Sequence, residues 1–277
     1  MIRSALMNVM IAAALKAGRG VKRDFGEVEN LLVSVKGPGD FVSNADKRAE
    51  KTLFEELSRA RPGYGFLMEE GGHVEGSDKS HTWHIDPLDG TTNFLHGLPI
   101  FAISIGLERE GQLVAGLVYN PATDDLYIAE RGQGAYLNNT RLRVAARRDF
   151  TDALITCGIP PLNRAPGHAR FQSELAHVMR YAGNVRRLGS AALDMCFVAA
   201  GRCDGYWERG IQTWDMAAGI VLIREAGGFV TDADGGSEMM ANGTICCGNE
   251  FIHRRLLDLL REANAGKRAP LARAAQL

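Results

Sequence analysis

TWHIDPLDGTTNFLHGLP, residues 82–99, combines a predicted strand, a proline turn and the start of a helix. Asp86 and Asp89 stand three residues apart in the turn, and Gly90 and Thr91 follow with backbone N–H groups. Carboxylates can hold a hard cation, and a helix N-terminus can hold an anion beside it. The stretch therefore indicates metal-dependent phosphate chemistry. An ordinary Asp-Gly turn, in which Asp89 caps the helix, is the alternative.

Further acidic residues follow apolar segments elsewhere in the chain. Asp215 opens the stretch WDMAAGIVLIREAGG, residues 214–228, whose apolar residues have helical spacing and whose final glycines are typical of a helix end. On local grounds Asp215 is equally well explained as a helix cap. Glu69 and Glu70 follow the apolar run 64–68, and a solvated charge pair is the commoner role of adjacent glutamates.

Taken together, these segments resemble the inositol monophosphatases of the bacterial type, within the lithium-sensitive, magnesium-dependent sugar phosphatase superfamily. That family has a Glu-Glu pair after a strand, then DP(I/L)DGT, then WD at a helix start followed by AG and EAGG. All three parts occur here in that order, and the similarity runs from about Lys36 to about Asn249. A match distributed over most of a chain is more specific than one short motif.

The resemblance implies a magnesium site with two or three ions. Its ligands would be the carboxylates of Glu69, Asp86, Asp89 and Asp215 and the backbone carbonyl of Leu88. Two carboxylates about 4 Å apart repel by roughly 4 kcal/mol at an effective dielectric constant near 20. Four of them in one cleft would therefore bind protons in part unless cations were present.

The resemblance also implies the catalytic groups. Asp46 and Thr91 correspond to the pair that activates a water molecule together with the metal, and Glu69 is expected to assist them. Because no Ser, Cys or His lies in a nucleophile motif of its own, no phosphoenzyme is expected. Considered alone, Asp46 is an ordinary first-turn acid of the amphipathic helix predicted over SNADKRAEKTLFEEL.

The substrate-binding residues are implied in the same way and comprise Asp89, Gly90, Thr91, Thr92, Gly189, Ser190, Ala191, Glu208 and Asp215. Ser190 is also a plausible helix cap, and Glu208 could be a surface acid at a strand end. Lys36, in the loop sequence VKGPGD, matches a lysine that approaches the metal and phosphate in relatives. Met68 departs from the family, in which Gly, Ser or Thr often precedes the first glutamate. The polar segment 71–80 is either a flap over the site or a plain surface loop.

Composition restricts the function less strongly. The chain has 277 residues, 45% hydrophobic and 23% charged, which is typical of a globular protein. A formal net charge of −1 gives no reason to expect a nucleic-acid partner, and no apolar stretch is long enough to cross a membrane. The five cysteines have no CxxC spacing, which favours buried thiols in a reducing cytoplasm. A helix is predicted over residues 2–18, the family resemblance implies that it docks on the fold, and a cleaved signal peptide is the alternative.

The coarse pattern predicts an antiparallel sheet in the first half and a mixed sheet in the second, and the family resemblance implies a layered αβαβα sandwich of the α+β class. Residues 1–145 are expected to form an N-terminal lobe with an antiparallel sheet and the metal motif. Residues 146–265 are expected to form a C-terminal lobe with a mixed sheet and the alcohol-binding residues, followed by a disordered tail over 266–277. Further helices are predicted over 44–59, 167–181, 190–200, 214–226 and 250–263, and strands over 65–68, 82–86, 101–108, 113–120 and 126–130.

The sequence therefore predicts a magnesium-dependent phosphomonoesterase that hydrolyses inositol 1-phosphate or a similar polyol phosphate. A histidinol-phosphate phosphatase, or another sugar-phosphate phosphatase, is the alternative within the superfamily. A binding or regulatory protein on a phosphatase scaffold is the alternative from another class. The family resemblance also implies that the protein is a homodimer and is inhibited by lithium. Because magnesium requires near-octahedral geometry and calcium prefers more ligands at longer distances, we expect excess calcium to inhibit the enzyme.

Overall fold

The computed structural model describes residues 3–27, 33–37, 40–160 and 165–266. Its α-helices are α1 (Ala5–Phe25), α2 (Asn44–Ala60), α3 (Thr91–Leu95), α4 (Ala165–Met179), α5 (Ala191–Ala199), α6 (Thr213–Glu225), α7 (Met239–Asn242) and α8 (Glu250–Asn264). Its strands are β1 (Val33–Gly37), β2 (Asp40–Ser43), β3 (Gly65–Met68), β4 (Gly72–Val74), β5 (His81–Asp89), β6 (Ala102–Arg109), β7 (Gln112–Asn120), β8 (Asp125–Glu130), β9 (Gly134–Leu137), β10 (Thr140–Arg141), β11 (Leu154–Cys157), β12 (Asn184–Arg186), β13 (Gly205–Arg209), β14 (Phe229–Thr231) and β15 (Thr244–Gly248). A short 3₁₀ turn, η2 (Phe150–Asp152), precedes β11.

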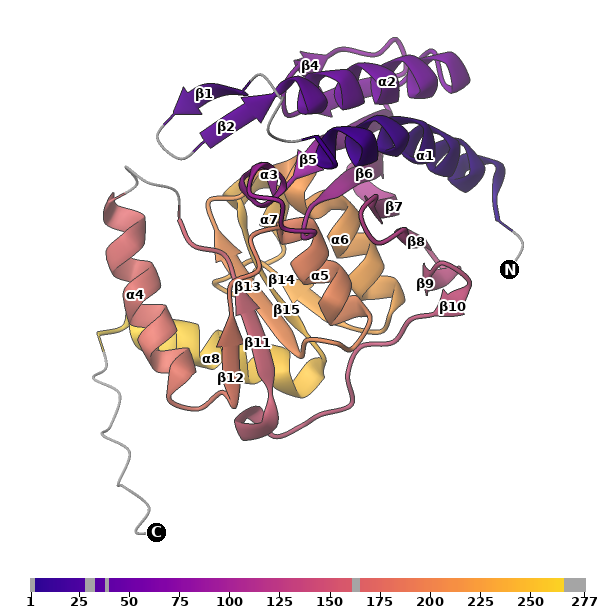
Figure 1. Ribbon diagram of the computed structural model, residues 1–277. Helices are drawn as coiled ribbons and strands as arrows, with labels where there is room; N and C mark the ends of the chain where they lie inside the picture. The colour runs from indigo at the N-terminus through magenta and orange to yellow at the C-terminus, as the bar shows by residue number, and fades with distance from the viewer. Residues whose placement is uncertain (1–2, 28–32, 38–39, 161–164, 267–277) are drawn as a thin grey trace, which may run out of the picture.

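Helices and sheets alternate in layers, as the sequence predicts (Figure 1). Helices α1 and α2 cover one face of the first sheet, α5 and α6 lie between the two sheets, and α4 and α8 cover the outer face of the second sheet. The αβαβα sandwich is therefore confirmed. The boundary near residue 145 stays a prediction, because one hydrophobic cluster combines residues from both halves, including Val118, Tyr127, Leu193 and Ile220.

The first sheet has the strand order β10-β9-β8-β7-β6-β5-β3-β4. The expectation that it is antiparallel is wrong at one pair, since β3 runs parallel to β5. The chain reverses direction through the edge strand β4 before it returns to β5, which places the ends of β3 and β5 at the same edge of the sheet. The second sheet, β12-β11-β13-β15-β14, is mixed as expected.

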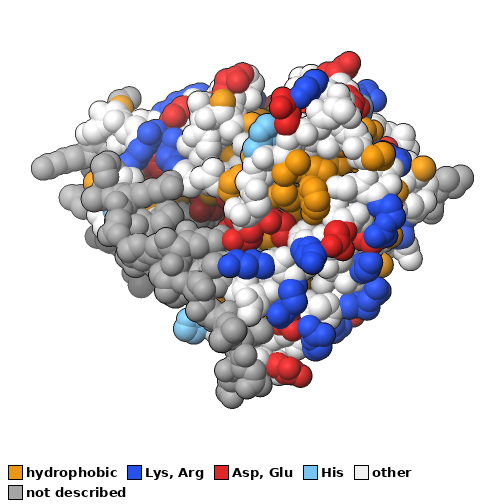
Figure 2. Space-filling view, turned by 90° about the horizontal axis from the view of Figure 1, so that it is seen from above, with side chains coloured by type: hydrophobic (Ala, Val, Ile, Leu, Met, Phe, Trp, Pro, Cys, Tyr) orange, Lys and Arg blue, Asp and Glu red, His pale blue; other side chains and the backbone are white. Residues whose placement is uncertain are grey.

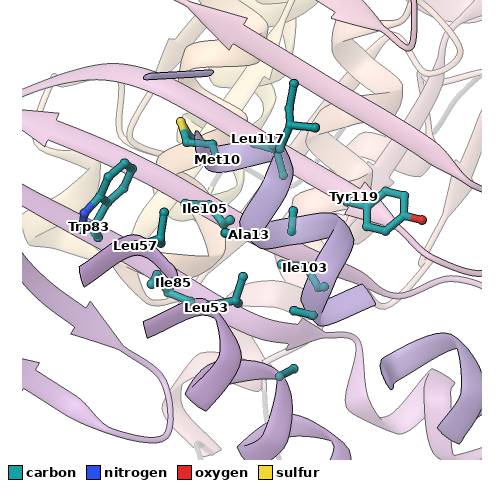
Figure 3. Packing of buried hydrophobic residues seen from close by; sticks show 14 of the residues in the cluster. Met10, Ala13, Leu53, Leu57, Trp83, Ile85, Ile103, Ile105, Leu117 and Tyr119 are labelled. Carbon is teal, nitrogen blue, oxygen red and sulfur yellow. The ribbon is translucent and has the colours of Figure 1, made fainter. Parts of the chain in front are cut away.

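The first core lies between α1, α2 and the first sheet. Met10 and Ala13 of α1 and Leu53 and Leu57 of α2 pack against the apolar face of β5 to β7 (Figure 3). The strand residues of this contact are Trp83, Ile85, Ile103, Ile105 and Leu117, all fully buried. The docked N-terminal helix is thereby confirmed, and it extends to Phe25, beyond its predicted end at residue 18, because Ala17 and Val21 continue the buried face.

Helix α6 forms the centre of the molecule and is buried between the sheets. A β-carbon on Gly106 would lie 2.5 Å from Cβ of Ala217, and one on Gly116 would overlap the backbone of Ala218. Glycines on β6 and β7 therefore allow α6 to lie directly on the sheet. This close approach fixes the position of Asp215, in the first turn of α6, relative to the end of β5.

Several expectations concern segments at the edges of the fold. VKGPGD was expected to be a loop, but Lys36 lies in β1, which pairs with β2 as an antiparallel hairpin. Segment 71–80 contains β4 and a turn in which Asp78 accepts a hydrogen bond from the Ser80 N–H at 2.9 Å. Tail residues 267–277 lie outside the described residues. Among the residues that are described, no helix has the length and apolar character of a membrane span.

Candidate active site

The turn that follows Ile85 holds the first two acidic residues of the site. Strand β5 pairs with β6 up to Asp86, and the register shifts before Asp89. Asp86 is 2% exposed, and its Oδ1 accepts a hydrogen bond from the backbone N–H of Leu88 at 2.8 Å. Gly90 has φ +91°, and a β-carbon there would lie 2.8 Å from the carbonyl oxygen of Ile100. Only glycine fits this turn without strain.

Asp89 points to a different helix from the one predicted. The following helix, α3, has no side-chain cap. Instead, Oδ2 of Asp89 accepts hydrogen bonds from Ser190 Oγ at 2.6 Å and from the backbone N–H of Ala192 at 2.7 Å. Asp89 thus binds the N-terminus of α5, about a hundred residues further along the chain.

Glu69 reaches the site because β3 and β5 are parallel. Met68 is paired with Ile85, so Glu69 and Asp86 follow at the same edge of the sheet. The backbone N–H of Glu69 continues this pairing with a bond to the Ile85 carbonyl at 3.2 Å. Met68 itself is 5% exposed and belongs to the first core, so the departure from the family pattern fills space in the interior.

Asp46 and Thr91 are brought together as predicted. The Thr91 hydroxyl lies 3.1 Å from Asp46 Oδ1 and 3.0 Å from the Leu88 carbonyl oxygen, and it can donate to either. Asp46 Oδ2 accepts from the Ser43 N–H at 2.9 Å and from the Ser43 hydroxyl at 2.6 Å. One oxygen of Asp46 therefore closes the capping box of α2 and the other binds Thr91, so the cap predicted on local grounds is compatible with the predicted pairing with Thr91.

Asp215, like Asp46, both caps a helix and lies close to other groups of the site. Its Oδ2 accepts the backbone N–H of Gln212 at 2.7 Å, which caps α6. Its charge also raises the pKa of Asp86. The cap proposed on local grounds and the membership of the acidic cluster are thus compatible.

The acids at this place perturb one another. Burial raises the pKa of Asp86 well above its usual value, and the charges of Glu69, Asp89 and Asp215 raise it further. The pKa of Asp215 is raised in the same direction by burial and by Asp89 and Glu69. Burial also raises the pKa of Asp89, against the lowering effect of its bonds from Ser190 and Ala192. Negative charge is therefore concentrated where the sequence predicts the metal ligands.

Among the described residues, no three His, Cys, Asp or Glu side chains group as a set of metal ligands. The charges of the acids nevertheless act on one another, and a divalent cation between them would replace repulsion by attraction. In the view from above, red acidic side chains gather near the middle of the face, beside an orange hydrophobic patch (Figure 2).

The residues predicted for the alcohol lie next to the acids. Ser190 caps α5 and donates to Asp89, and Gly189, with φ +88°, turns the chain into this helix. Burial raises the pKa of Glu208, on β13, to about 7, and the nearby Asp89 charge adds to this rise. Ala191 is the first residue of α5, and Thr92, in α3, is exposed. The side chain of Lys36 lies outside the described part of the structure.

Sequence reasoning missed two residues here. Asn93 is buried, and its Nδ2 donates to the carbonyls of Ile100 and Leu188, both at 2.8 Å, which joins α3 to the segment before α5. Arg187 is the positive charge that lowers the pKa of both Asp89 and Glu208. In the sequence, the only indication of these two residues is that Asn93 follows the motif GTT (90–92) and Arg187 lies just before GSA (189–191). Tertiary contacts are needed to identify them as part of the site.

Comparison with known proteins agrees with this architecture. A layered αβαβα fold with an all-oxygen acidic site between distant segments is that of a phosphatase acting on small phosphate esters. The chain belongs to the inositol monophosphatase family, whose model matches residues 3–265.

Individual relatives cover nearly the whole chain. An inositol-1-monophosphatase of Mesorhizobium japonicum is 62% identical over 95% of this chain and 98% of its own length. The Nus factor SuhB of Escherichia coli K12 is 40% identical over 93% of this chain and 96% of its own. The crystal structure of the extragenic suppressor protein suhB from Bartonella henselae superposes with a TM-score of 0.90 at 55% identity, covering 94% of this chain and 99% of that one.

Proposed function

We propose that this protein is a magnesium-dependent phosphomonoesterase that hydrolyses myo-inositol 1-phosphate, or a similar polyol phosphate, to the alcohol and inorganic phosphate. The observation that carries the proposal is the gathering of four acids from three segments, namely Glu69 after β3, Asp86 and Asp89 at the end of β5, and Asp215 in the first turn of α6. The relative in M. japonicum, which is named an inositol-1-monophosphatase, supports the choice of substrate.

The donor set fits magnesium, a hard cation that takes oxygen ligands. Glu69, Asp86, Asp89, Asp215 and the Leu88 carbonyl would hold it, with two or three ions in all. Bound magnesium would lower the pKa of a water molecule and neutralise charge that develops on the phosphate oxygens. Inhibition by lithium and by excess calcium belongs to the same proposal.

The attacking water would be oriented by Thr91. Because the Thr91 hydroxyl donates its proton towards Asp46 or Leu88, its oxygen lone pairs remain to accept a hydrogen bond from water. Asp46 thereby orients Thr91, and Glu69 would accept a further proton from the same water. The N-termini of α2, α5 and α6 carry partial positive charge, which favours a phosphate close to Gly90 and Thr92. Gly189, Ser190, Ala191 and Glu208 would contact the alcohol.

A direct test is a panel of phosphate esters with the purified protein, first treated with a chelator and then titrated with magnesium. We expect no hydrolysis after chelation, recovery with magnesium, and the highest kcat/KM for inositol 1-phosphate or another polyol phosphate. Asp86→Asn should lower kcat/KM by roughly a thousandfold or more, since it removes several kcal/mol of metal-derived stabilisation. A clear preference for histidinol phosphate over every polyol phosphate would contradict the substrate assignment.

A non-catalytic role is a second candidate, which the name of the E. coli relative, Nus factor SuhB, supports. A binding or regulatory function on this scaffold could exist beside catalysis. Complementation of a deletion strain separates the two, because Asp86→Asn should restore a binding role and fail to restore a catalytic one. Restoration of every phenotype by the inactive variant would assign the biological role to binding.

We also propose a homodimer in the cytoplasm, with no nucleic acid required for catalysis. The family resemblance supports the dimer, and sedimentation velocity would measure it. All five cysteines are free and buried, which suits a reducing compartment.

A further inference from the structure

Gly158 and Glu208 compete for one space beside the acidic cluster. Gly158 follows β11, and its N–H donates to the Trp207 carbonyl at 3.2 Å, so that the parallel pairing of β11 with β13 continues past Cys157. A β-carbon added to Gly158 would overlap the carboxyl group of Glu208, including both of its oxygens. The Glu208 carboxyl therefore occupies the volume that a side chain at position 158 would fill.

We infer that Gly158 is a positioning residue that determines substrate specificity. Because position 158 has no side chain, the Glu208 carboxyl has the space in which it can face the alcohol. The inference rests on the proposed function, in which Glu208 binds a substrate hydroxyl.

Backbone conformation does not explain this glycine. Gly158 does not have a positive φ, unlike Gly90 and Gly189. An alanine could adopt the same backbone without strain. What position 158 requires is space, and the space is filled by a functional side chain.

The remaining contacts of Glu208 hold its carboxyl at this place. The Tyr206 hydroxyl, from the same strand, donates a short hydrogen bond to Oε2. Among the described residues, Oε1 accepts no hydrogen bond, so it remains for a substrate hydroxyl. Arg187 supplies a nearby positive charge, and Asp194 lies behind as a buried negative one. A carboxyl displaced from Gly158 would lose this arrangement.

The same geometry makes the inference testable without loss of the fold. The three atoms nearest to a new methyl group all belong to the carboxyl group of Glu208, which is the end of a flexible side chain and can rotate. Gly158→Ala should therefore fold normally and move only Glu208.

The experiment compares inositol 1-phosphate with 4-nitrophenyl phosphate, which carries no ring hydroxyl, in the magnesium-loaded enzyme. We expect Gly158→Ala to raise KM for inositol 1-phosphate about tenfold, which corresponds to the loss of roughly one hydrogen bond, with kcat changed less than about twofold. KM for 4-nitrophenyl phosphate should not change. Gly20→Ala is the matched control, because a methyl there meets no atom within 4 Å.

A double-mutant cycle with Glu208→Ala then identifies the route of the effect. The double variant should have the same KM as Glu208→Ala alone, since no carboxyl remains to be displaced. The inference would be overturned if the increases in KM of the two single variants multiplied in the double variant. It would also be overturned if Gly158→Ala raised KM equally for inositol 1-phosphate and 4-nitrophenyl phosphate, or left KM for inositol 1-phosphate unchanged. Should wild type prefer a different ester, the substrate assignment fails, and the same cycle measured on that ester still decides the role of Gly158.

Discussion

Three acidic residues of the cluster, Asp86, Asp89 and Asp215, each use one carboxylate oxygen to bind local backbone or a helix end. Oδ1 of Asp86 accepts the Leu88 N–H, Oδ2 of Asp89 accepts the Ala192 N–H, and Oδ2 of Asp215 accepts the Gln212 N–H. These bonds fix the direction of each carboxylate before any ligand binds, which reduces the rearrangement that binding requires. The mutual repulsion of the acids is the opposing term, and it destabilises the fold when no cation is bound.

Replacement of Asp86 by Asn should therefore stabilise the metal-free protein. Asn keeps an oxygen that can accept the Leu88 N–H and removes a charge that Glu69, Asp89 and Asp215 repel. We expect the midpoint of thermal unfolding in a chelator to rise, by about 2–4 °C for each kcal/mol gained. Magnesium should raise the midpoint of the wild type more than that of Asp86→Asn. A lower midpoint for the variant in the chelator would show that repulsion is not the dominant effect.

At the scale of elements, the site is assembled from helix N-termini and the adjacent ends of two parallel strands, β3 and β5. The first turns of α2 and α6 supply Asp46 and Asp215, and the N-cap of α5 supplies Ser190. The first N–H groups of a helix have no partner within the helix, so side chains or ligands accept them and the helix end carries partial positive charge. The helices therefore contribute positive potential for a phosphate and geometric anchors for the acids. The contact of Ser190 with Asp89 joins α5 to the turn after β5.

Ser190→Ala should weaken both the helix and the site. The hydroxyl accepts the Leu193 N–H at 3.3 Å and donates to Asp89, so its loss should cost about 1 kcal/mol of unfolding free energy as a lost cap. We expect magnesium affinity to fall by roughly 10-fold or more, as for a residue that orients a metal ligand. Urea unfolding and a magnesium titration of activity measure the two effects. Ser190→Thr is the control and should retain most of the unfolding free energy and most of the magnesium affinity. An unchanged magnesium titration in Ser190→Ala would contradict the orienting role of Ser190.

At the scale of the whole molecule, stability comes from the packing of helices on both faces of each sheet, with α6 buried between the two sheets. The outer layer meets the second sheet at His253 of α8, which is 8% exposed and whose Nε2 lies 3.0 Å from Thr231 Oγ1 of β14. Burial, with a smaller effect of Arg261, lowers the pKa of His253 from 6.5 to about 4. The unfolded chain therefore binds a proton at this residue more readily than the folded protein does.

Folding stability should consequently decrease as the pH falls from about 6.5 towards 4. The contribution of His253 is fully present above its unfolded pKa, and about 2 kcal/mol of it should be lost between pH 7 and pH 5. Urea unfolding at the two pH values, for wild type and His253→Gln, measures this contribution as the difference between their pH dependences. Equal pH dependence in the two proteins would show that another group is responsible.

The amino-acid sequence by itself determined the long helices and the identity of the acidic residues. Helical periodicity placed α2, α5, α6 and α8 within one or two residues of their ends, because each pattern is local and repeats over several turns. The motifs around Asp86 and Asp215 identified the family, and the family implied the residues that the structure groups. Their catalytic and ligating roles remain predictions.

Only the tertiary structure decided how those residues meet. The parallel pairing of β3 with β5, the binding of Asp89 to α5, and the space shared by Gly158 and Glu208 link positions between 17 and 103 residues apart. Local patterns carry no information on such contacts, because strand order and helix packing depend on how whole layers bury their apolar faces. Layer packing, with α6 held directly on the glycines of β6 and β7, therefore sets the geometry of the site.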